Sequence, residues 1–83
     1  MAESIESQLK QMIVERLFLR VDPDAIEDDK SLIADYGVDS VCLLELVVGL
    51  EETFGIAVGD SEFRVANFAT VEALAAFVRG KIQ

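Results

Sequence analysis

The stretch DYGVDSV, residues 35–41, lies near the middle of an 83-residue chain, at the junction between a polar segment and an apolar one. The residues before it include Asp22-Pro23-Asp24 and Asp28-Asp29-Lys30-Ser31, a turn-rich composition that cannot sustain a long helix. After it, apolar residues recur at helical spacing. We therefore expect a loop to end here and a helix to start at Asp39 or Ser40, continuing to Phe54, where Gly55 stops it.

Three further helices are predicted from apolar residues at helical spacing behind a capping residue. They span residues 4–19, 60–65 and 70–82, with Ser4, Asp60 and Thr70 as the N-caps. No segment alternates polar and apolar residues as a β-strand does, and no internal repeat is present. The predicted fold class is all-α, a four-helix bundle with three longer helices and one short helix, in a single domain of residues 1–83.

Residues 21–39 are predicted to form a long ordered loop between the first two long helices. We expect apolar side chains to tie it to the core: Leu32, Ile33, Tyr36 and Val38. The loop begins like a calcium-binding EF-hand, with DPD at 22–24. However, the sixth position would be Glu27 instead of Gly, and the twelfth would be Ile33 instead of Glu, so we expect no calcium site.

The charge of the chain restricts its partners. Sixteen acids against seven bases give a net charge of −9, and residues 22–62 hold twelve acids and one base, a net charge of −11. Such a field repels the phosphates of nucleic acids and anionic membranes. We therefore expect basic protein partners and no nucleic acid. We also expect the chain to be a monomer.

The single cysteine, Cys42, excludes an internal disulfide, and a chain without histidine has no ordinary zinc site. We expect a reducing compartment. Residues 1–9 contain acids and no apolar signal region, and no apolar run approaches the roughly 20 residues that span a bilayer. The sequence thus predicts a cytoplasmic location, no membrane insertion and no metal.

The helix after DYGVDSV has two distinct faces if each residue advances by roughly 100°. The predicted core face consists of Leu43, Leu46, Val47, Leu50 and Phe54. Opposite to it lies a surface that we call the mixed strip: Val41, Leu44, Glu45, Val48, Glu51 and Glu52. The strip is either an ordinary solvated face or a docking surface, on which carboxylates steer a basic partner and aliphatic side chains hold it.

Ser40 has four possible roles. A catalytic nucleophile needs a base, and the chain has no histidine to provide one, so we expect no catalytic residues. Ser40 could instead cap the helix or be phosphorylated, because negative charge is tolerated at a helix N-terminus. In the fourth role, another enzyme brings its own metal and base and modifies the exposed hydroxyl.

The residues 35–41, followed by Glu45-Leu46, Leu50-Glu51-Glu52 and Phe54, resemble the acyl carrier proteins, in which an Asp-Ser-Leu motif opens the second helix. The resemblance extends from Ile5 to about Ile82. It implies that Ser40 carries 4′-phosphopantetheine, transferred from coenzyme A by a phosphopantetheinyl transferase, and that the terminal thiol of this arm bears an acyl thioester. The protein would catalyse nothing, and would deliver its cargo to acyl-loading and acyl-processing enzymes with basic docking surfaces.

The same resemblance assigns roles to further residues. The recognition surface would comprise Asp39, Val41, Glu45, Val48, Glu51 and Glu52, nearly the same set as the mixed strip. An acyl chain could enter between the helices at Leu32, Leu43, Leu50, Phe68 and Leu74, although ordinary core packing explains these residues equally well.

Three features depart from the common fatty-acid carriers. Val41 replaces the usual Leu, Cys42 stands where Asp is frequent, and residues 61–71 are about two residues longer and end like specialised carriers of polyketide, aminoacyl and modified-lipid pathways. We therefore expect a discrete, specialised acyl carrier protein of fatty acid, polyketide or lipid synthesis. The alternatives are an aminoacyl or peptidyl carrier, and a non-covalent interaction module with a carrier-like fold.

Overall fold

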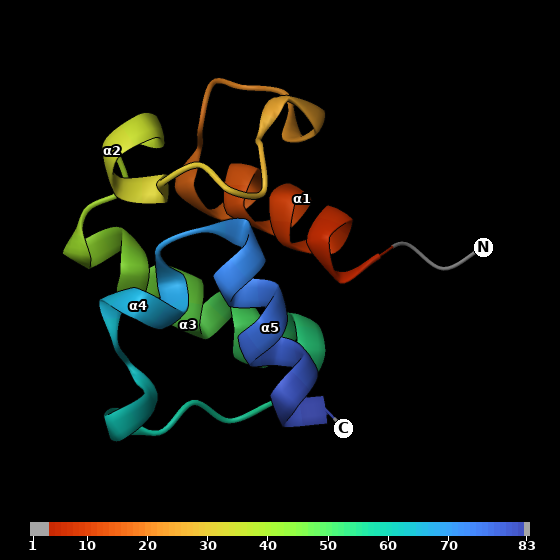
Figure 1. Cartoon of the computed structure of the whole chain (residues 1–83), viewed down its shortest axis with the longest axis vertical. Helices are drawn as coiled ribbons and strands as arrows, with labels where there is room; N and C mark the ends of the chain where they lie inside the picture. The colour runs from red at the N-terminus through yellow and green to blue at the C-terminus, as the bar shows by residue number, and fades with distance from the viewer. Residues whose placement is uncertain (1–3, 83) are drawn as a thin grey trace.

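The computed structural model describes residues 4–82, which form helices and connecting turns without a β-strand (Figure 1). The longer helices are α1 (Ile5–Leu17), α3 (Ser40–Phe54) and α5 (Val71–Ile82), and the shorter ones are α2 (Leu32–Tyr36), α4 (Val65–Phe68) and the 3₁₀ turns η1 (Pro23–Ala25) and η2 (Asp60–Glu62). The predicted all-α class with three longer helices is confirmed. Residues 1–3 and 83 of the predicted domain lie outside the described part of the chain.

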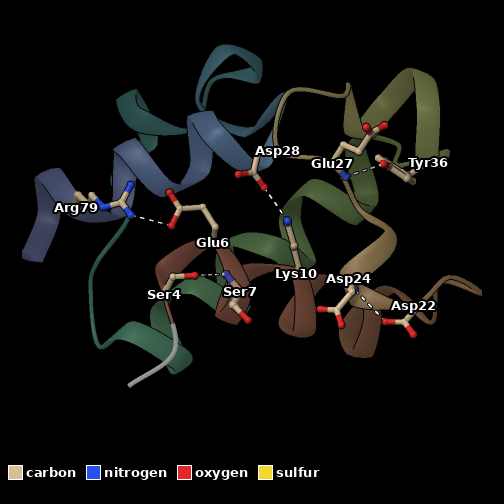
Figure 2. A network of polar contacts seen from close by, with 10 residues as sticks. All are labelled: Ser4, Glu6, Ser7, Lys10, Asp22, Asp24, Glu27, Asp28, Tyr36 and Arg79. Carbon is tan, nitrogen blue, oxygen red and sulfur yellow. Dashed lines mark hydrogen bonds and ion pairs between the residues drawn. The ribbon is translucent and has the colours of Figure 1, made fainter. Parts of the chain in front are cut away.

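Helix α1 begins where the sequence predicts. Ser4 Oγ accepts a hydrogen bond of 3.0 Å from the backbone N–H of Ser7, which satisfies one of the free donors of the first turn (Figure 2). The helix ends at Leu17, two residues before the predicted end, because Phe18 adopts the left-handed conformation with φ of 54°. Residues other than glycine rarely adopt this backbone conformation, and a residue that does so cannot continue a right-handed helix.

The segment between α1 and α3 is ordered as predicted, but it contains a short helix that the sequence pattern did not reveal. Ser31 Oγ accepts from the N–H of Ala34, the carboxylate of Asp35 accepts from the N–H of Ser31, and Gly37 ends α2 in the left-handed conformation. A capping serine and a terminal glycine were therefore present in the sequence. Five residues are too few to show the recurrence of apolar residues every three or four positions by which a helix is predicted.

Three of the four predicted anchors of this segment contact the core. Leu32 and Val38 are buried, and Tyr36 is half-buried with its hydroxyl accepting from the N–H of Glu27 (Figure 2). Ile33 is 41% exposed, so its prediction as an anchor was wrong. In a single short helix, Leu32 faces the core, and the adjacent residue is turned by roughly 100° toward solvent.

The helix predicted at residues 60–65 was misplaced. Residues 60–62 form only the 3₁₀ turn η2, and the short helix lies at 65–68. The reason is Phe68, which is fully buried and packs its ring against Phe63 and Phe77. Burial of this large side chain places the helical turn around it.

The three longer helices, whose arrangement Figure 1 shows, supply most of the buried core residues. α1 packs against both α3 and α5, and α4 packs against α5. Thr70 Oγ1 caps α5 by accepting from the N–H of Ala73, as predicted. The loop is held to the start of α5 by two backbone hydrogen bonds, from the N–H of Leu32 to the carbonyl of Ala69 and from the N–H of Glu72 to the carbonyl of Asp28.

Within residues 4–82, no helix is both long enough and apolar enough to cross a bilayer. The same part of the chain contains no cluster of three or more metal-ligating side chains.

Candidate functional site

Ser40 is the first residue of α3, and Asp39 is its N-cap. Asp39 Oδ1 accepts a hydrogen bond of 2.9 Å from the backbone N–H of Cys42. This hydrogen bond holds the pKa of the Asp39 carboxyl below its usual range. The cap is therefore the aspartate and not the serine, which leaves the serine hydroxyl without a structural role at the helix start.

The hydroxyl of Ser40 is accessible to another molecule. The residue is exposed, and among the described residues its side chain has no hydrogen-bond partner. No histidine exists in the chain to deprotonate it. A negatively charged group attached to Ser40 would face the positive end of the 15-residue helix α3, where the first backbone amides lack helical acceptors.

The turn before Ser40 is fixed by its neighbours. Gly37 takes φ of 71°, and the N–H of Val38 donates to the carbonyl of Leu32 over 3.0 Å. The side chain of Val38 is buried in the core. The chain thus passes directly from α2 to α3 through a short, anchored turn (Figure 1). Ser40, directly after this turn, is exposed.

The apolar members of the mixed strip are exposed, as the helical-wheel argument predicts. Val41 is 71%, Leu44 55% and Val48 42% exposed, and all three lie on α3 downstream of Ser40. Glu45 and Glu52 are also exposed. The opposite face of the helix holds the buried residues Leu43, Leu46, Gly49 and Leu50, whereas the predicted core residues Val47 and Phe54 are only partly buried.

Two contacts of the strip were not foreseen from sequence. Glu51 is partly buried, and its Oε2 accepts from the N–H of Val58 over 2.9 Å, so it secures the segment that follows α3. Arg16 of α1 reaches the carboxylates of Glu45 and Glu52. The glutamates were recognised by their helical spacing, but an arginine some thirty positions upstream carries no local signal for such a contact.

The five residues of the predicted acyl pocket all lie in the closed core, each at most 3% exposed: Leu32, Leu43, Leu50, Phe68 and Leu74. Two surface hollows are present elsewhere. One lies beside α1 and includes Arg16 and Thr53, and the other includes Leu19 and Tyr36. Entry of an acyl chain between the helices would therefore require the core side chains to separate.

Comparison with known proteins identifies the family. The family model of the phosphopantetheine attachment site matches residues 7–78. The acyl carrier protein of Bdellovibrio bacteriovorus is 35% identical over 78 residues, which cover 94% of this chain and 95% of that protein. The chain belongs to the acyl carrier protein family. This carrier also resembles the acyl carrier protein of Campylobacter hominis, with 46% identity over 55 residues that cover 66% of the carrier and 67% of its relative.

Solved structures agree with the fold of the carrier. One match is a chain in the crystal structure of an engineered glycine:[carrier protein] ligase from Bradyrhizobium japonicum, complexed with a carrier protein from Agrobacterium tumefaciens and AMP. The TM-score is 0.79 at 26% sequence identity, and the match covers 89% of this carrier and 97% of that chain. The holo acyl carrier protein of Nitrosomonas europaea matches in fold with a TM-score of 0.84 at 23% identity, covering 96% and 98%. An acyl carrier protein is a non-enzymatic carrier that bears a phosphopantetheine arm.

The carrier offers a site that suits such an arm. The arm needs a surface hydroxyl with room for a phosphodiester, and Ser40 provides one beside the free amides of α3. Asp39 orders the turn without occupying that hydroxyl. Cys42 is half-buried on the flank of α3, consistent with a small packing residue.

Proposed function

We propose that this acyl carrier protein bears its 4′-phosphopantetheine arm on Ser40 and carries acyl intermediates as thioesters on the thiol of the arm. The observation that carries the assignment is the exposed hydroxyl of Ser40, which has no hydrogen bond to residues 4–82, on a helix turn whose cap is supplied by Asp39. The family match includes this turn near the middle of its range.

The chemistry of attachment explains why the chain needs no histidine. Ser40 Oγ forms a new bond to the phosphorus that bears the pantetheine half of coenzyme A, and the bond from that phosphorus to the nucleotide half breaks. The hydroxyl proton goes to a base of the visiting transferase, and the leaving phosphate carries away the bond electrons. This carrier contributes the oxygen, the ordered turn and the positive end of α3, which favours the phosphodiester negative charge.

The partners proposed for the carrier are phosphopantetheinyl transferase and acyl-loading or acyl-processing enzymes with basic docking surfaces. The mixed strip supports this proposal, because exposed aliphatic side chains and carboxylates alternate beside Ser40. We propose Val41, Glu45, Val48 and Glu52 as direct contacts, together with the exposed Leu44. Glu51 contributes mainly by shaping the end of α3 through its hydrogen bond to Val58.

The departures at Val41 and Cys42 and the longer segment 61–71 support a specialised role in fatty acid, polyketide or lipid synthesis. An aminoacyl cargo is the second candidate, because a structural neighbour is a carrier protein complexed with a glycine:[carrier protein] ligase. The mass of the group on the arm, measured on protein from its host, distinguishes an acyl from an aminoacyl cargo. The cytoplasmic location, the monomeric state and an acyl pocket between the helices remain predictions.

The transfer reaction tests the attachment site. Wild-type carrier incubated with coenzyme A, Mg²⁺ and a broad-specificity phosphopantetheinyl transferase should gain the mass of one arm, and Ser40→Ala should gain none. Ser61→Ala is the matched control, because Ser61 is also exposed and should not affect the gain. A folded wild-type protein that several transferases leave unmodified would support the non-covalent interaction module instead.

A further inference from the structure

Arg16 links α1 to the mixed strip of α3. Its Nη1 lies 2.8 Å from Glu45 Oε1, and its Nη2 lies 2.5 Å from Glu52 Oε1. The two glutamates are seven residues apart, two helical turns on one face, so that a single planar guanidinium bridges both. The hydrogen bond to Glu45, and to a lesser extent the one to Glu52, raises the pKa of Arg16 above its ordinary value.

The side chain of Arg16 packs closely over a glycine of α3. Gly49 lies on α3 between the two glutamates, and a Cβ atom there would come within 2.5 Å of Met12 Sδ, 2.7 Å of Arg16 Cδ and 2.9 Å of Arg16 Nε. Real Cβ atoms do not approach other heavy atoms so closely, so a larger residue at position 49 would force the flexible side chains of Arg16 and Met12 to shift. The glycine is buried under this side chain.

The contact changes what the strip offers to a partner. Glu45, Glu52 and Arg16 together carry a charge of −1, where the two glutamates alone would carry −2. Each carboxylate already accepts from an arginine, the group with which a basic partner would bind it. Val41, Leu44 and Val48, in contrast, are exposed and uncovered.

We propose that Arg16 is an internal competitor for basic partners and therefore determines the specificity of the docking surface. A partner can bind the carboxylates of Glu45 and Glu52 only after it displaces the guanidinium of Arg16. Arg16 therefore weakens docking by enzymes that bind these carboxylates through Lys and Arg side chains. It favours partners that bind the aliphatic residues of the strip. This inference rests on the proposed docking function of the strip and adds a residue from α1 to it.

The expected effect is modest, because exposed ion pairs are weak and are screened by salt. Replacing Arg16 by Gln should raise kcat/KM of a phosphopantetheinyl transferase for the apo carrier about two- to fivefold at low ionic strength, through a lower KM. The charge-preserving Arg16→Lys should give a smaller rise, because lysine cannot bridge two carboxylates in a planar fork.

The matched control is Arg79→Gln. Arg79 is more exposed than the half-buried Arg16, but it is likewise paired with a glutamate, Glu6 of α1, and its replacement changes the net charge by the same amount (Figure 2). It should alter kcat/KM by less than about 1.5-fold, and melting curves of all variants check folding. The advantage of Arg16→Gln over this control should disappear at high salt.

Three outcomes decide the matter. If wild type is modified at Ser40 and Arg16→Gln is modified at the same rate as Arg79→Gln, the competitor role is overturned. It is also overturned if Arg16→Gln is modified more slowly than wild type, which would mean that Arg16 itself contacts the partner. If wild type is not modified at all, the proposed attachment function fails instead. A double-mutant cycle gives an independent result: Glu45→Gln should impair modification more in the Arg16→Gln background than in the wild type.

Discussion

At the scale of single residues, Asp39 and Ser40 have different roles at the start of α3: Asp39 caps the helix, and Ser40 presents a hydroxyl. Asp39 caps α3 through the N–H of Cys42, and the exposed hydroxyl of Ser40 has no hydrogen-bond partner in the part of the chain that the structure describes. Sequence reasoning alone left open which of the two is the cap. The extended backbone of Asp39 and its hydrogen bond decide it.

The Asp39 cap makes stability depend on pH. Its pKa is lowered in the folded protein, so the unfolded chain binds a proton at higher pH than the folded one does. The contribution is therefore complete above the unfolded pKa, about 3.9, and is lost as pH falls through the lower folded value. Urea unfolding should show Asp39→Ala to be less stable than wild type at pH 7, with a difference that shrinks below about pH 4. A difference that stays constant down to pH 2 would contradict the charged cap.

At the scale of helices, the capped ends and the longer helices were predictable from the sequence, and the short helices were not. Ser4, Thr70 and Gly55 act as their residue types suggest. Helix α2 was missed, and the helix expected at 60–65 lies at 65–68, because packing of Phe68 decides its place. The Arg16 bridge also depends on how α1 packs against α3, and this cannot be read from local pattern.

The cap of α5 gives a prediction at this scale. Thr70 Oγ1 satisfies the N–H of Ala73 at a partly buried helix start. Thr70→Ala should lower the free energy of unfolding by about 1 kcal/mol, measured by urea denaturation. Ser61→Ala, at an exposed position in η2, should stay within about 0.5 kcal/mol of wild type. Equal stabilities of the two variants would mean that the Thr70 bond contributes nothing.

At the scale of the whole molecule, cations from both ends of the chain pair with some of the acids in the middle of the sequence. Lys10 and Arg16 of α1 pair with Asp28 and with the glutamates of α3, and Lys81 of α5 pairs with Glu62. A net charge of −9 nevertheless remains. Repulsion among the remaining carboxylates therefore acts against the folded state.

Salt should consequently stabilise the fold at pH 7. Added NaCl screens the repulsion over the whole surface, whereas the exposed ion pairs it also screens each contribute little. The melting temperature should rise between very low salt and about 0.15 M NaCl, where the screening length is about 8 Å. A fall over this range would show that the ion pairs outweigh the excess of acids.

The most direct test of the central claim is localisation of the arm on the modified protein. Fragmentation mass spectrometry of carrier treated with coenzyme A and a phosphopantetheinyl transferase should place one phosphopantetheine on Ser40 and none elsewhere. An arm on another serine, or its persistence on folded Ser40→Ala protein, would contradict the account.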